Sequence, residues 1–106
     1  MHQVISDRVG EAAAFFQLGM LADRLGRTEA GWRLVAVSWL IDDAVGHEDA
    51  ESDLRALADL CVKAWLDKTQ RKKLLADVAE SYDLDRGRSL IERAFNPDVD
   101  NASASG

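Results

Sequence analysis

The densest run of apolar residues in the chain lies between positions 31 and 45, with the sequence GWRLVAVSWLIDDAV. Arg33 and Ser38 are the polar breaks in its first ten positions. A short apolar run is compatible with a buried strand, but Thr28 is a good N-cap residue ahead of it and Gly46 a good stop after it. The pattern therefore predicts a helix, and a helix that is apolar all round has to be covered all round.

The segment from residue 7 to residue 25 is also apolar on more than one side, and Gly26 is expected to end it. Because the connection that follows is short, the two helices should form an antiparallel hairpin over residues 7–45. A glycine inside a helix costs about 1 kcal/mol relative to alanine. Gly19 lies in the middle of the first helix, so we expect a close helix crossing there.

The hairpin resembles a single tetratricopeptide repeat at Leu18, Gly19, Gly26 and Ala30. Its turn is one residue shorter than in that family, and no second copy of the motif follows along the chain. The resemblance implies two packed helices joined by a glycine turn, which the hydrophobic pattern also predicts.

Three more helices are expected after the hairpin. The first covers residues 49–66 with a regular amphipathic spacing, and the others cover 69–82, with Thr69 as N-cap, and 86–95. Residues 96–106 are small and polar, and we expect them to be disordered. The inward face of the 49–66 helix is formed by Leu54, Leu57, Ala58, Cys61, Ala64 and Trp65. The chain is thus predicted to be an all-α bundle of about five helices in one domain, residues 1–95.

Two helices that are apolar nearly all round need more cover than three shorter helices supply. Leftover apolar surface on a protein usually marks an interface, and the simplest cover is a second copy of the chain. We therefore expect a homodimer. The residues predicted to form a protein interface are Trp32, Val35, Trp39, Phe15 and Phe16.

The chain has 106 residues and a formal net charge of −6. A protein this acidic is more suited to a basic protein partner than to gripping nucleic acid through its whole surface. Cys61 is the only cysteine, so an internal disulfide and a cysteine-built zinc site are both excluded, which fits the cytoplasm. No apolar run approaches the roughly 20 residues that cross a bilayer as a helix, and no membrane partner is expected.

The acidic segment 42–53 is the one cluster with metal-ligand character, since it combines six carboxylates with His47. It lacks the alternation and the glycine of a calcium-binding loop, and helix capping explains the same residues. Cys61 and His47 are a conceivable nucleophile and base, but buried cysteine is common in cores. We expect no catalytic residues, no metal and no cofactor, and therefore a protein that acts by binding.

An alternative function comes from the uneven charge: residues 1–62 carry 5 basic and 11 acidic side chains, whereas residues 63–95 carry 8 basic and 6 acidic. Residues 74–95 resemble a helix-turn-helix of DNA-binding regulators. Asp83 stands where the turn glycine is usual, and Ser89 where a buried residue is usual. The resemblance implies DNA contacts from Arg71, Lys72, Lys73, Arg86, Arg88 and Arg93.

Overall fold

A computed structural model describes residues 2–96, with side chains described from residue 7 onward. Within that part, the chain forms helices and no strand, so the predicted all-α class is confirmed. Apart from Asn96, the predicted disordered tail lies outside the described residues. The helices are α1 (His2–Arg24), α2 (Thr28–Val45), α3 (Asp49–Lys63), α4 (Lys68–Asp85) and α5 (Arg88–Phe95). None of them is long and apolar enough to cross a membrane.

The predicted antiparallel hairpin of α1 and α2 is present, and these two helices make the most extensive contact in the molecule. Gly19 and Gly31 face each other where they cross. A Cβ atom built on Gly19 would lie 2.8 Å from the carbonyl oxygen of Gly31 and 2.6 Å from the Val35 side chain. Any side chain there would force the helices apart, which confirms the tight crossing expected at Gly19.

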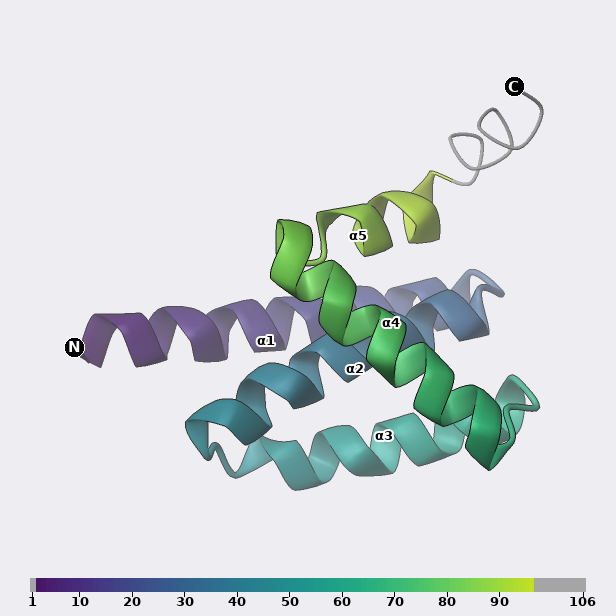
Figure 1. Cartoon of the computed structure of the whole chain (residues 1–106), viewed down its shortest axis with the longest axis horizontal. Helices are drawn as coiled ribbons and strands as arrows, with labels where there is room; N and C mark the ends of the chain where they lie inside the picture. Colours follow the sequence, from purple (N-terminus) through teal and green to yellow (C-terminus); the bar gives the residue numbers. More distant parts are fainter. Residues whose placement is uncertain (1, 97–106) are drawn as a thin grey trace.

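Helix α2 is the centre of the fold, because it packs against each of the other four helices (Figure 1). Leu34, Val35, Ala36 and Val37 are fully buried in succession, as an all-round apolar helix requires. The expectation that the later helices cannot cover α2 is therefore wrong for this part of the helix. Short helices on several sides, including α5 with Leu90 and Ala94 buried, supply the missing cover.

The helix ends differ from the prediction in detail. Gly46 stops α2 in the left-handed conformation, as expected, but the cap of α4 is Asp67 and not Thr69. The Asp67 carboxylate accepts from Gln70 N, and the Gln70 side chain accepts from Asp67 N, a reciprocal capping box. Helix α4 also continues to Asp85, so that only two residues separate it from α5.

Trp65 corrects the prediction for the end of α3. Its side chain was expected on the inward face, yet it is 90% exposed. The reason is local: α3 ends at Lys63, and the Trp65 backbone has a positive φ of 59°. The chain therefore leaves the helical path before Trp65, and helical spacing no longer decides where that ring points.

Candidate functional site: an apolar groove with a basic rim

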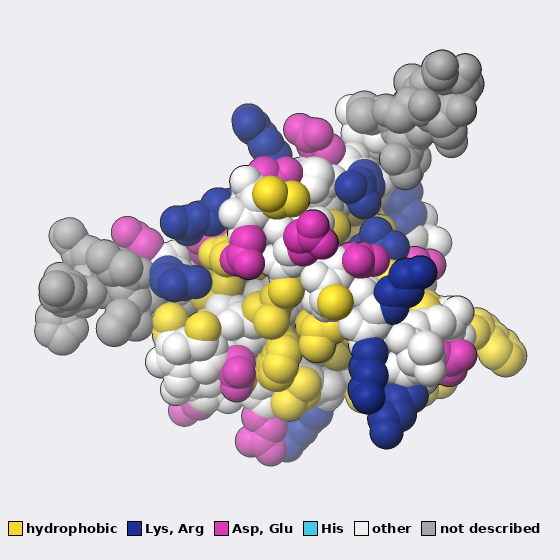
Figure 2. Space-filling model, viewed as in Figure 1, with side chains coloured by type: hydrophobic (Ala, Val, Ile, Leu, Met, Phe, Trp, Pro, Cys, Tyr) yellow, Lys and Arg dark blue, Asp and Glu magenta, His cyan; other side chains and the backbone are white. Residues whose placement is uncertain are grey.

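Helices α3 and α4 both pack on α2 but make almost no contact with each other. Between them lies a groove of about 330 Å³, which we call the apolar groove. Figure 2 shows apolar side chains exposed at the centre of this face, with Lys and Arg side chains gathered beside them. The groove is lined by Trp32, Trp39, Leu54, Leu57, Ala58, Lys68, Arg71, Lys72 and Leu75.

Each helix contributes a different part of this groove. Helix α2 supplies two tryptophans one heptad apart, Trp32, which is 4% exposed, and Trp39, which is partly buried. Helix α3 supplies an apolar wall in which Leu54 is 48% exposed. Helix α4 supplies Leu75 and the basic residues. An indole beside a half-exposed leucine in a concave surface resembles the apolar centre of a protein interface.

The basic rim consists of Lys68, Arg71 and Lys72, which lie on the first turns of α4 at helical spacing. All three are exposed, and none forms an ion pair with another described residue. Within residues 7–96, no acidic side chain lines the groove. A protein of net charge −6 therefore carries a local positive edge at its most apolar opening.

The predicted interface residues divide between core and surface. Phe15 and Val35 are buried among the chain's own helices, and neither lines the groove. Phe16 is partly buried in a separate depression. Only Trp32 and Trp39 come together at the groove. The sequence reasoning missed Leu54, Ala58 and Leu75 because their spacing was read as ordinary core, and nothing local shows that α3 and α4 diverge.

The six predicted DNA contacts fall into two groups. Arg71, Lys72 and Lys73 lie near the start of α4, and Arg86, Arg88 and Arg93 lie at or after its end. Fourteen residues of helix separate Lys72 from Arg86, which corresponds to about 21 Å at 1.5 Å per residue. With eight residues, α5 is also short for a recognition helix. The structure therefore does not gather these side chains on one patch.

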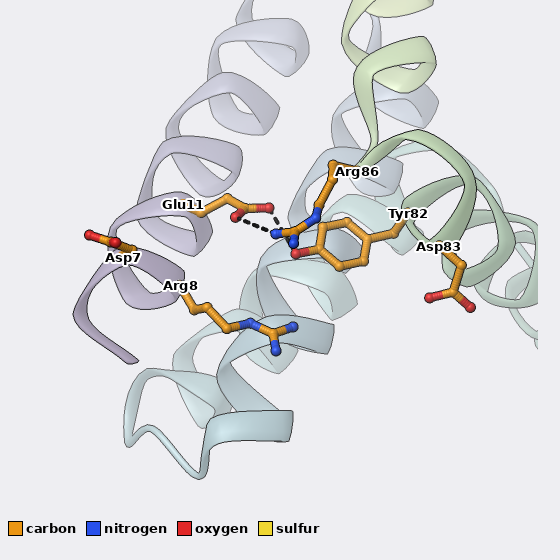
Figure 3. Close-up of a pocket in the computed structure, with 6 residues that line it drawn as sticks. All are labelled: Asp7, Arg8, Glu11, Tyr82, Asp83 and Arg86. Carbon is orange, nitrogen blue, oxygen red and sulfur yellow. Dashed lines mark hydrogen bonds and ion pairs between the residues drawn. The ribbon is translucent and has the colours of Figure 1, made fainter. Parts of the chain in front are cut away.

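Arg86 belongs to a polar pocket of about 460 Å³ between α1 and the end of α4 (Figure 3). Tyr82 Oη donates to Glu11 Oε1 at 2.8 Å, and Arg86 Nη1 lies 3.6 Å from Glu11 Oε2. Burial and then the Glu11 hydrogen bond raise the pKa of Tyr82. Tyr82, Glu11 and Arg86 therefore form a polar clamp between α1 and α4. Arg8 Nε, in the same pocket, is buried without a hydrogen-bond partner among the described residues.

Two residues of the acidic segment are buried, which helix capping alone does not explain. Asp42 on α2 and Asp53 on α3 are each 3% exposed. Burial, followed by the neighbouring Asp42, raises the pKa of Asp53 to about 7. A protonated Asp53 can donate to Asp42, which explains how two carboxyl groups share one dry site. Among the described residues, no group of three His, Cys, Asp or Glu side chains is placed to hold a metal ion.

Cys61 is buried against α2, and its burial raises the pKa of the thiol. A raised thiol pKa lowers the thiolate fraction, so this environment does not activate a nucleophile. His47 Nδ1 accepts a hydrogen bond from Asp49 N at 3.1 Å, at the start of α3.

Comparison of the chain with protein-family models, with curated proteins and with solved structures gave no match.

Proposed function

We propose that this protein is a binding module that acts without catalysis and holds apolar side chains of a protein partner in the apolar groove. The observation that supports it is the groove itself, where Trp39 of α2 is partly exposed and Leu54 of α3 is 48% exposed. Burying such surface is the main favourable term in protein association.

The homodimer remains a prediction, and exposed apolar residues outside the groove now support it. Leu25, Val62 and Trp65 are all more than half exposed. They lie at the same end of the molecule, because Lys63 Nζ forms an ion pair with Asp23 Oδ2 at 2.8 Å. We propose that a second copy would contact this end, and that it would not contact Phe15 or Val35, which are buried. Sedimentation at high micromolar concentration tests it, and a monomer there contradicts it.

The binding function is tested by quantitative capture from an extract of the native cell. Ala58 is exposed on the groove wall, so Ala58→Arg should fill the groove without disturbing the core. Ala76→Arg makes the same substitution at an exposed alanine of α4 that lies outside the groove and outside the predicted dimer contact. Proteins retained by the unaltered chain and by Ala76→Arg, but lost with Ala58→Arg, would support the proposal. Retention of the same proteins by Ala58→Arg would contradict it.

A further inference from the structure

The apolar groove is charged on one side only. Its α4 wall carries Lys68, Arg71 and Lys72, whereas its α3 wall contributes only Leu54, Leu57 and Ala58. An occupant that fills the floor therefore meets water and cations on one flank and apolar side chains on the other. Charges that lack a partner at the edge of an interface favour an occupant of opposite sign.

The spacing of the α4 wall indicates the form of that occupant. Lys68, Arg71, Lys72 and Leu75 follow one another at helical intervals, so they share one face over about 10 Å, or two turns. A partner helix lying alongside presents its own side chains with the same repeat. Figure 1 shows that α3 and α4 converge at the turn between them and diverge away from it.

We infer that the occupant of the apolar groove is an amphipathic helix of another protein, and this inference rests on the proposed function. The helix has an apolar stripe flanked by aspartate or glutamate on the side that faces α4. The apolar stripe covers Trp39 and Leu54, and the acidic flank pairs with the basic rim. A basic partner, expected from the overall charge of −6, would meet three cations at this edge. A nucleic acid would satisfy the rim but leave the indole and leucine exposed.

The test uses fluorescein-labelled helical peptides of about 16 residues, long enough to form a marginal helix. One has leucines at i, i+3, i+4 and i+7 flanked by glutamates. A second has lysines in place of the glutamates, and a third keeps the glutamates but replaces the leucines with alanine. By fluorescence anisotropy, the first should bind about tenfold more tightly than the second, and its affinity should fall as salt rises. The alanine peptide should not bind.

Charge-reversed variants locate the effect. Arg71→Glu combined with Lys72→Glu should remove the preference for the acidic peptide. The matched control, Lys73→Glu combined with Arg93→Glu, changes the same charge at exposed positions outside the groove and should keep it. Circular dichroism of both variants checks that the helices remain.

The outcomes separate this inference from the proposed function. If the acidic and basic peptides bound equally, and Ala58→Arg bound neither, the inference of an acidic partner would be overturned. The groove would still be a binding site. No binding of any leucine peptide would overturn the inference, and the capture experiment would still decide the proposed function. Tighter, rim-dependent binding of labelled duplex DNA would overturn it in favour of nucleic acid.

Discussion

Replacing Asp53 by asparagine is expected to make the protein more stable at neutral and alkaline pH. Asp53 is 3% exposed and shares a buried site with Asp42. Its pKa is raised from 3.8 to about 7, chiefly by burial and next by the neighbouring Asp42, while the Ser38 hydroxyl opposes the change. The folded protein therefore holds this proton more tightly than the unfolded chain does.

The sign and size of the effect follow from proton linkage. Below about pH 4 the carboxyl is protonated in both states, and the ionisation of Asp53 costs the folded state nothing. Between pH 4 and pH 7 only the unfolded chain releases the proton, so stability falls by about 1.4 kcal/mol per pH unit. Above pH 7 the loss levels off at roughly 4 kcal/mol, because the pKa values differ by about three units.

An asparagine at position 53 has no proton to lose, and its amide can still donate to Asp42. Allowing about 1 kcal/mol for a less favourable hydrogen bond, Asp53→Asn should be more stable than the unaltered chain by roughly 3 kcal/mol at pH 8. The advantage should vanish near pH 4.

Urea denaturation followed by tryptophan fluorescence between pH 4 and pH 8 measures this difference. Asp59→Asn changes an exposed carboxyl on the same helix and is the control, with no expected pH-dependent advantage. Titrations that the two proteins share cancel in the comparison. If Asp53→Asn were less stable than the unaltered chain at pH 8, or if its advantage were the same at pH 4 and pH 8, the raised pKa of Asp53 would be refuted.

Five further substitutions test the packing. Gly19→Ala should destabilise the protein by several kcal/mol in urea denaturation, because the added carbon meets the Gly31 carbonyl. Gly10→Ala, with nothing within 4 Å of the added carbon, should stabilise the protein by up to about 1 kcal/mol. Equal effects of the two substitutions would refute the close crossing. Trp32→Ala should cost about 3–5 kcal/mol and Trp39→Ala clearly less, by thermal unfolding. Asp67→Ala should cost about 1 kcal/mol through the lost cap of α4, and an unchanged midpoint would contradict that role.

Much of the architecture could be predicted from local pattern. The apolar run of α2, the glycine stop at Gly46 and the amphipathic α3 are properties of neighbouring residues, so the helical class and the hairpin followed from the order of side chains. Gly19 signalled the close crossing because a glycine inside a helix is unfavourable without a packing reason. The burial of Cys61 was predicted from its position on the inward face of the third helix.

The candidate site could not be predicted because it depends on how helices diverge in space. Periodicity shows which face of a helix is apolar, but it does not show whether a neighbour covers that face. Thus Phe15 and Val35, expected on the surface, are covered by the chain's own helices, while Leu54 is left open where α3 and α4 separate. The proximity of Lys68, Arg71 and Lys72 to the tryptophans of α2 joins residues far apart in the chain. Asp42 and Asp53 belong to one acidic segment, but they meet only because α3 packs back on α2. Such contacts depend on the packing angles between helices, which are set by all the interlocking side chains together.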